Sequence, residues 1–292
     1  MIQKALVPIA GKGARLMPVT SIVPKAMFPI VQHGSTIRCL LQLILEQIIS
    51  AGIEHVGIVV SAGQTNMLKR YFKSVLEGGY GKLPAHIEYI TQPSPEGFGD
   101  AVLRAATFVG DDPFILLLGD HVHIEKCGEP PCTAQIARAF DSSNGVAMIG
   151  VQQVSARELS KVGVASGTKI KGDIYLCKNF IEKPDLKTAR QELVTDGLSD
   201  GAFLAHCGIY AFTAEIFDCL SRVGEAAQRV SKEVELAEAQ SLLLGKYPKR
   251  YFLCEIAGRA YDIGVPQGYA DAQIAFQSKE WPARLNEVLA IA

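Results

Sequence analysis

Two glycines and two cations lie close together near the N-terminus and have the chemistry to bind an anion. Gly11 and Gly13 directly follow the apolar run at residues 4–10, which is typical of a strand buried on both faces of a parallel sheet. Glycines there let several backbone N–H groups approach a phosphate, because no Cβ stands in the way. Arg15 and Lys25 add positive charge to the same loop. The pattern predicts a polyphosphate site, although an ordinary strand-to-helix turn with solvated charges would carry the same glycine pair.

Two common phosphate-binding loops are excluded by the residues present. A Rossmann fingerprint needs a third glycine that opens a helix, but Leu16 stands there, and Pro18 and Pro24 disfavour a long helix. The closing Gly-Lys-Ser/Thr of a Walker A loop occurs nowhere in the chain. An extended, proline-stiffened loop is therefore expected to hold the cations over the end of the first strand.

Two further polar residues follow apolar runs. Asp120 ends the run FILLLGD, and a lone carboxylate in that place is either a cap or a ligand for a hard cation. Gln92 follows the expected strand at residues 86–91, and its amide offers one donor and one acceptor to the edge of a base. Taken alone, Gln92 is more often a turn residue.

The loop motif resembles that of a known enzyme family. It is similar to the signature of the sugar-nucleotide pyrophosphorylases, nucleotidyl transferases that act on sugar 1-phosphates, and reads Gly11-x-Gly13-x-Arg15-x-x-Pro18-x-Thr20-x-x-x-Pro24-Lys25. Within that family the bacterial UTP–glucose-1-phosphate uridylyltransferases are the most similar branch. The resemblance implies an enzyme that forms UDP-glucose and pyrophosphate from UTP and glucose 1-phosphate, with Mg²⁺ as cofactor.

The resemblance also implies roles for individual residues. Arg15 would hold the pyrophosphate and Lys25 would reach the α-phosphate, while Lys183, in Glu182-Lys183-Pro184, would bind the sugar phosphate. The remaining positions are Ala10, Gly11, Gly13, Gln92 and Gly97 for the nucleotide, Gly163, Glu182 and Gly208 for the sugar, and Asp120 and Asp262 for the metal. Asp262 has a second interpretation, as a cap for the turn that follows it.

This chain departs from the family at two positions. His121 follows Asp120 where the uridylyltransferases usually have a second aspartate, and Ala26 follows the loop lysine where they commonly have glutamate. Because adjacent residues on extended backbone point to opposite sides, His121 is expected to face away from the metal. A separate zinc site is the less favoured interpretation, since the spacing of His121, His123, Cys127 and Cys132 matches no standard zinc finger.

Alternating strands and helices indicate the fold that would position these residues. We expect an α/β fold, with a Rossmann-like, mostly parallel mixed sheet flanked by helices and a sugar-binding lobe. Ligands of such sheets bind at the carboxyl ends of strands, where Gly11, Gln92 and Asp120 all fall. The expected strands are 4–10, 56–60, 86–91, 114–118, 146–152, 163–166, 173–180, 202–212 and 250–255, and the expected helices are 36–51, 67–76, one N-capped by Asp100, 233–244, 267–276 and 282–290.

Length and composition favour one large catalytic unit. We expect a single nucleotidyltransferase domain at residues 1–292, with a nucleotide-binding half at 1–145, a sugar-binding half at 146–265 and C-terminal helices at 266–292. A net charge of −1 argues against nucleic acid as a partner, and no segment is apolar enough for a membrane. Seven cysteines, an odd number, suit reduced thiols in a cytoplasm. A homodimer or homotetramer is expected.

Two other functions are compatible with the residues. A thymidylyltransferase, or an enzyme for another sugar, would carry the same loop. A regulatory paralogue that binds nucleotide sugars without catalysis is suggested by His121 and Ala26. The joint presence of Arg15, Lys25, Asp120 and Lys183 argues against this last interpretation, because a binding module needs neither cationic clamps nor a metal carboxylate.

Overall fold

The described residues fold into one large sheet, two small ribbons and the helices that cover them. The computed structural model describes residues 1–34 and 36–278. The strands are β1 (Lys4–Pro8), β2 (Pro29–Val31), β3 (Ile37–Cys39), β4 (His55–Ser61), β5 (His86–Gln92), β6 (Phe114–Leu117), β7 (His121–Glu125), β8 (Ala147–Ser155), β9 (Gly163–Lys171), β10 (Ile174–Glu182), β11 (Ala202–Phe212), β12 (Tyr251–Glu255) and β13 (Gly258–Asp262). The α-helices are α1 (Leu40–Ser50), α2 (Gln64–Glu77), α3 (Phe98–Leu103), α4 (Ala106–Val109), α5 (Cys132–Asp141), α6 (Leu186–Glu192), α7 (Glu215–Val230), α8 (Leu236–Lys246) and α9 (Pro266–Gln277).

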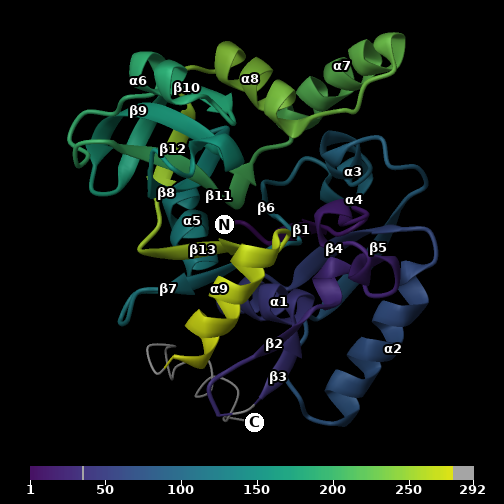
Figure 1. The fold of residues 1–292 in the computed structure, drawn as a ribbon. Coiled ribbons are helices and arrows are strands. Elements are labelled where there is room, and N and C mark those ends of the chain that lie inside the picture. Colours follow the sequence, from purple (N-terminus) through teal and green to yellow (C-terminus); the bar gives the residue numbers. More distant parts are fainter. Residues whose placement is uncertain (35, 279–292) are drawn as a thin grey trace.

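A mixed nine-stranded sheet runs through both halves of the chain (Figure 1). Its order is β5-β4-β1-β6-β11-β8-β12-β10-β9. The four strands of the first half are parallel, whereas β11 joins them antiparallel to β6 and the second half is mainly antiparallel. β9 also pairs back to β11, so the second half curls on itself. The expected α/β class with a mixed sheet is confirmed.

Helices cover both faces of the sheet, which therefore has two cores. The central strand β1 shows how both are filled, because Ala5 and Val7 enter the core under α1, α5 and α9, while Leu6 enters the core under α3, α7 and α8. An apolar run without polar alternation is the pattern of a strand buried on both faces. A smaller third cluster lies under α6. Among the described residues, no helix combines the length and the apolar character needed to cross a bilayer.

Several predicted elements differ from the structure. The helix expected at 36–51 begins only at Leu40, because the residues before it form β3 in a short ribbon with β2, and the Cys39 side chain caps the helix. The helix expected at 233–244 is α8, which begins at Leu236. Asp100 is not an N-cap: α3 begins at Phe98, and Gly97 occupies the cap position. The helix predicted at 282–290 lies outside the described residues.

The second half contains more helix than predicted. Helix α7 was not identified from the sequence, although Ile216, Leu220, Val223 and Ala227 follow helical spacing and are all buried. Helix α5 and the ribbon of β7 with β13 were also missed. That ribbon matters for function, since it brings His121 and Asp262 to the candidate site.

Candidate active site

A cavity of about 810 Å³ opens at the carboxyl ends of the parallel strands. Its floor comes from the loops after β1, β5 and β6, and its far wall comes from β9, β10 and β11. Every residue that received a role from the sequence lines this cavity: Ala10, Gly11, Gly13, Arg15, Lys25, Gln92, Gly97, Asp120, Gly163, Glu182, Lys183, Gly208 and Asp262. Their individual roles stay predictions, but the structure brings them to one place.

The loop after β1 is held in a compact shape by local contacts. Gly13 has a φ of 66°, and the Thr20 hydroxyl donates a hydrogen bond to its carbonyl oxygen at 2.9 Å. A Cβ at Gly13 would lie 2.9 Å from the Thr20 methyl group, so only glycine fits this turn. The Lys25 ammonium lies against Gly11, close enough that a Cβ there would be 3.9 Å from its nitrogen. The glycine loop and the Lys25 ammonium therefore line the same space.

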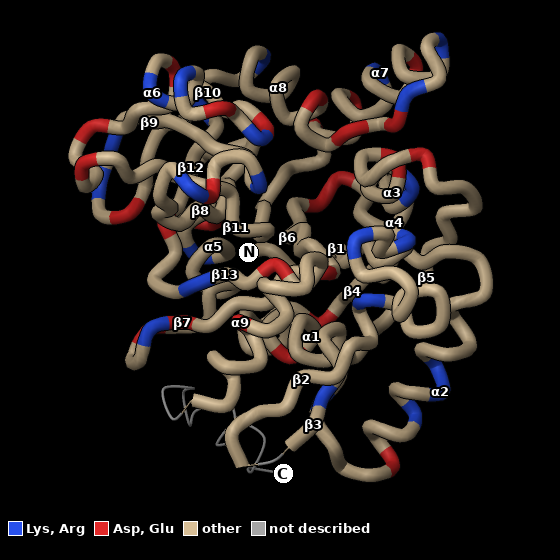
Figure 2. Tube along the Cα trace, viewed as in Figure 1, with Lys and Arg blue, Asp and Glu red and all other residues tan. Residues whose placement is uncertain are grey.

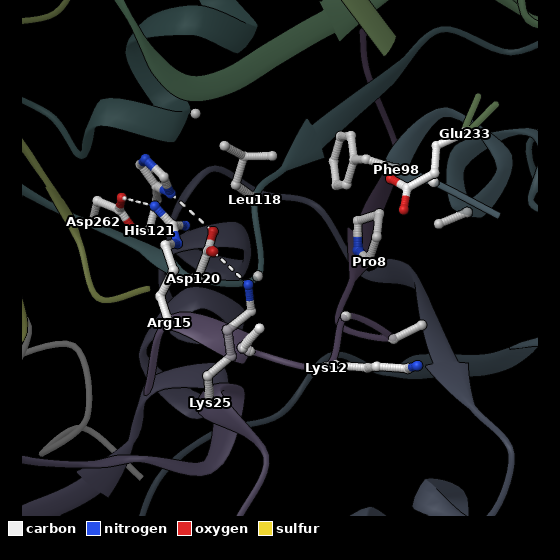
Figure 3. A pocket seen from close by; sticks show the side chains of 18 of the residues that line it. Pro8, Lys12, Arg15, Lys25, Phe98, Leu118, Asp120, His121, Glu233 and Asp262 are labelled. Carbon is white, nitrogen blue, oxygen red and sulfur yellow. Dashed lines mark hydrogen bonds and ion pairs between the residues drawn. The ribbon is translucent and has the colours of Figure 1, made fainter. Parts of the chain in front are cut away.

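A cluster of charges occupies the end of the cavity beside this loop. Asp120 lies at its centre, 2.5 Å from the Lys25 ammonium and 3.0 Å from Nδ1 of His121 (Figure 3). Arg15 lies 3.6 Å from the Asp262 carboxylate, at the same end. The cluster alternates acid and base, so each buried or half-buried charge has a partner of opposite sign.

Long-range pairing assembles this cluster. In the ribbon of β7 and β13, Asp262 is paired with His121, and the next amide, at Ile263, donates to the Asp120 carbonyl at 2.8 Å. Gly264 completes the arrangement. A Cβ at Gly264 would lie 2.8 Å from Asp120, 2.9 Å from Asp262 and 3.0 Å from Arg15, so a larger residue would fill the space that the three share.

The orientation of His121 corrects one prediction. The expectation that His121 faces away from the site is wrong, because Gly119 and Asp120 form a turn rather than extended backbone, with the His121 amide donating to Leu118 at 3.2 Å. The turn places the Asp120 and His121 side chains on the same side. His121 therefore belongs to the charged cluster.

The pKa values of this pair move in opposite directions. Burial alone would raise the pKa of Asp120, but the hydrogen bond and charge of His121, together with Lys25, outweigh burial and hold that pKa well below its usual range. Burial would lower the pKa of His121, yet the hydrogen bond with Asp120 and the charges of Asp120 and Asp262 raise it. An ionised carboxylate at Asp120 is what a cation ligand requires.

Three side chains of the cluster are spaced to hold a metal ion. One ligand atom each from Asp120, His121 and Asp262 lies within 4.8 Å of the others, and no second group of this kind occurs in residues 1–34 and 36–278. Two carboxylates fit a hard divalent cation, and the imidazole adds a nitrogen ligand that such ions use less often.

The suggested zinc set does not assemble. His123 is fully buried with Nε2 2.7 Å from the Cys207 carbonyl, while Cys127 is exposed and Cys132 lies in the core.

At the opposite end, Gln92 and Gly97 form a polar corner suited to a base. Gln92 is 6% exposed, and its Nε2 donates to the Gly97 carbonyl at 3.1 Å and to the Asp100 carboxylate at 2.8 Å. From the sequence, Gln92 was expected to offer one free donor and one free acceptor. Both amide hydrogens are instead used within the protein, so only the carbonyl oxygen is left for a ligand.

The far wall carries Glu182 and Lys183, whose side chains are 3.1 Å apart. Lys183 has a φ of 48°, and its amide donates to the Val162 carbonyl at 3.1 Å, which turns the chain after β10. Gly163 lies beside them, and a Cβ there would lie 2.8 Å from the Glu182 carboxylate, so the Glu182 side chain would have to move. A Cβ at Gly208 would lie 3.0 Å from the His121 ring, so Gly208 makes room for His121.

Further cavity residues were not identified from the sequence. They include two cations, aromatic rings and a carboxylate, and they are Lys12, Phe98, Lys161, His206, Tyr210 and Glu233. The sequence could have indicated His206 and Tyr210, because both lie on the strand predicted at 202–212. It could not have indicated Glu233, because that residue reaches the cavity from the loop between α7 and α8.

Comparison with known proteins places the chain in a family. Residues 4–279 match the family model described as Nucleotidyl transferase. The chain belongs to the nucleotidyl transferase family. A UTP–glucose-1-phosphate uridylyltransferase of Bacillus subtilis (strain 168) is 32% identical, over 96% of this chain and 93% of the relative. A uridylyltransferase of the same name from Streptococcus pyogenes is 31% identical, over 94% of this chain and 88% of the relative.

Solved structures of the family agree with this fold. A crystal structure of a UDP-glucose pyrophosphorylase complexed with UDP-glucose superposes with a TM-score of 0.78 at 28% identity, covering 94% of this chain and 98% of that one. The family membership makes the cavity at the strand ends a candidate site for nucleotidyl transfer.

Proposed function

We propose that the protein is a UTP–glucose-1-phosphate uridylyltransferase, which forms UDP-glucose and pyrophosphate. The observation that carries the proposal is the single cavity where the glycine loop, Lys25, Asp120, Gln92 and Lys183 meet. Two relatives that are 31–32% identical over nearly the whole chain are UTP–glucose-1-phosphate uridylyltransferases, which supports the choice of substrates.

The arrangement of charges suits transfer between two phosphates. An anionic oxygen of the sugar 1-phosphate attacks the α-phosphorus of UTP, a new P–O bond forms, and the bond to the β-phosphate breaks to release pyrophosphate. The nucleophile is already ionised, so the main barriers are charge repulsion and alignment. Four carboxylates and five cations line the cavity. The cations are Lys12, Arg15, Lys25, Lys161 and Lys183.

Different parts of the cavity would bind the two substrates. Lys183 and Glu182 on the far wall would hold the sugar phosphate and the sugar hydroxyls. Arg15 and Lys25 would hold the triphosphate beside the glycine loop, where they stabilise the charge that develops on the leaving pyrophosphate. Gln92 would orient the base at the other end of the nucleotide.

A divalent cation fits the same arrangement. Asp120 and Asp262 would hold Mg²⁺, which supplies positive charge to the phosphates when bound. Gly264 keeps the space between these carboxylates open. The charged partners already present at Asp120 lower the pKa of its carboxyl, so it is ionised and ready for a cation.

Location and assembly are part of the proposal. All seven cysteines are unpaired, and six are buried, which agrees with a reducing cytoplasm. Lys/Arg and Asp/Glu positions are interspersed along the trace of both halves in the described part of the chain (Figure 2), a distribution that does not suggest nucleic acid as a partner. A homodimer or homotetramer is expected, and light scattering coupled to size-exclusion chromatography tests it.

A substrate panel tests the function. Pyrophosphate release should be fastest, by kcat/KM, with UTP and glucose 1-phosphate in the presence of Mg²⁺. A higher value with dTTP or with N-acetylglucosamine 1-phosphate would favour the thymidylyltransferase or another sugar specificity. No turnover with any pair, by a protein that binds UDP-glucose, would favour a regulatory paralogue.

A further inference from the structure

A buried chain of hydrogen bonds lies behind Gln92 and Gly97, which together form the base corner of the cavity. Asp100, in α3, is 5% exposed and accepts from Nε2 of Gln92 at 2.8 Å. Its other oxygen accepts from Nε of Arg104 at 3.1 Å, one helical turn further along. Arg104 in turn lies 3.6 Å from Glu96, at the surface. A buried carboxylate is costly unless such partners hold it, so its presence behind Gln92 calls for a reason.

These contacts leave one orientation for the Gln92 amide. Both groups facing its Nε2, the Gly97 carbonyl and the Asp100 carboxylate, can only accept hydrogen bonds. If the amide rotated by half a turn, its carbonyl oxygen would face two acceptors and three polar groups would lose their partners. That cost keeps the NH₂ group inward.

The consequence is that Gln92 presents only an acceptor to the cavity. Its Oε1 makes no hydrogen bond within the described residues, whereas both of its hydrogens are committed. Uracil and thymine carry an N–H at ring position 3 and can donate to such an oxygen. Cytosine has a bare, accepting nitrogen at that position, so it would be repelled.

We propose that Asp100 is a positioning residue that fixes Gln92 as an acceptor and thereby restricts the nucleotide to bases with a ring N–H, excluding cytosine. The inference rests on the proposed function, since it requires a nucleoside triphosphate in this cavity. Arg104 holds the Asp100 carboxylate in place, and that carboxylate holds the Gln92 amide in one orientation. The choice of base therefore depends on Asp100 and Arg104, which lie behind Gln92.

The sharpest test is Asp100→Asn, which keeps the shape of the side chain. Arg104 donates to the oxygen on its side, so the amide nitrogen that this substitution introduces faces Gln92 and donates to it. The NH₂ of Gln92 then faces a donor at position 100 and still an acceptor at Gly97, and the reverse holds after rotation, so the amide is no longer held in one orientation and can offer its NH₂ to the cavity. In equilibrium binding without sugar phosphate, the ratio of the CTP to the UTP dissociation constant should fall by about 10- to 100-fold, while the KM for glucose 1-phosphate stays unchanged.

A matched control separates this effect from a general disturbance. Glu96→Gln removes the negative charge beside Arg104 but leaves Asp100 in place, so it should keep the wild-type preference for UTP. If Asp100→Asn weakens UTP and CTP equally, Asp100 is only structural and the inference is overturned. If the wild type binds no nucleoside triphosphate, the proposed function itself fails, which is a distinct result.

A measurement on the wild type covers the case of a variant that does not fold. The triphosphate of 3-methyluridine has the uracil shape but no N–H at position 3. It should bind the wild-type protein about 10-fold or more weakly than UTP, and this difference should shrink in Gln92→Ala, which lacks the accepting oxygen. Equal binding of the two nucleotides to the wild type would overturn the inference.

Discussion

Lys183 contributes through its side chain at the rim of the cavity. Its side chain is 57% exposed and contacts Glu182, so truncation removes a charge without opening the core. Lys183→Ala should lower kcat by roughly 100- to 1000-fold with an unchanged melting temperature, as the loss of a positioned charge does. Lys187→Ala, an exposed lysine on α6 outside the cavity, is the control. Equal rates for both variants would show that Lys183 is a surface charge with no role in catalysis.

His121 is the residue whose role changed most between sequence and structure. Its contact with Asp120 at 3.0 Å suggests that it orients the carboxylate or binds the metal itself. His121→Ala should weaken binding of Mn²⁺, measured by electron paramagnetic resonance as a probe for Mg²⁺, by about 10- to 100-fold. Asp120→Asn should abolish most of this binding. Unchanged binding in both variants would show that the metal lies elsewhere.

At the scale of elements, the loop before α8 closes over the base corner. The Gly99 amide donates to the Val234 carbonyl at 2.8 Å, and the Val234 amide donates to the Glu96 carbonyl at 2.8 Å. Gly97 has a φ of 109°, and a Cβ there would lie 2.5 Å from the Val234 carbonyl oxygen. The glycine is therefore required by both its conformation and its neighbour.

Gly97→Ala should reduce the free energy of unfolding by about 1–3 kcal/mol and weaken UTP binding. Gly110→Ala is a matched control, because Gly110 also has positive φ, at 62°, but has open space around its Cβ position. The control carries the backbone strain without the clash and should leave UTP binding unchanged. If both variants bind UTP as the wild type does, the loop before α8 does not shape the base corner.

His123 makes β7 sensitive to acid. It is fully buried, Nε2 donates to the Cys207 carbonyl, and Nδ1 has no hydrogen-bond partner among the described residues. Burial lowers its pKa to about 4 from 6.5. Between those two values the unfolded chain binds a proton that the folded protein does not, so stability is complete above pH 6.5 and falls as the pH drops towards 4.

At pH 5 this loss should amount to about 2 kcal/mol relative to pH 7.5, from His123 alone. Urea denaturation at the two pH values measures it. His123→Gln, which can still donate to Cys207, should have a flatter pH dependence over this range. An unchanged dependence would place the acid sensitivity elsewhere, for instance at His206, whose pKa burial also lowers to about 4.

At the scale of the whole molecule, the sequence predicted those parts of the site whose residues are close together along the chain. The glycine loop and the strand ends carrying Gln92 and Asp120 were identified because apolar runs, glycines and polar ends are close in sequence. The direction of His121 was not, because the backbone was expected to stay extended through Asp120, whereas Gly119 and Asp120 form a turn, and the Asp120 carbonyl accepts a hydrogen bond from Ile263, far along the chain. Likewise, the donors of Gln92 were counted as free because nothing in the sequence indicated that Asp100 would face them.

The sheet explains why the residues proposed to bind the two substrates lie in one cavity. β6 and β11 join the halves edge to edge, so the strand end at Asp120 and the strand carrying Gly208 are neighbours. That the chain is a single domain with nucleotide-binding and sugar-binding halves stays a prediction. The shared sheet supports it, because β6 of the first half and β11 of the second are adjacent strands of one continuous sheet.

In the proposed reaction, this cavity transfers the uridylyl group of UTP to glucose 1-phosphate and releases pyrophosphate. Phosphorus-31 NMR of the wild-type protein with both substrates and Mg²⁺ follows every phosphate directly. The signals of UTP should decline while those of UDP-glucose and pyrophosphate rise in equal amounts, with no such change when a chelator removes the metal. Release of inorganic phosphate in place of pyrophosphate, or no change in the spectrum, would contradict the assignment.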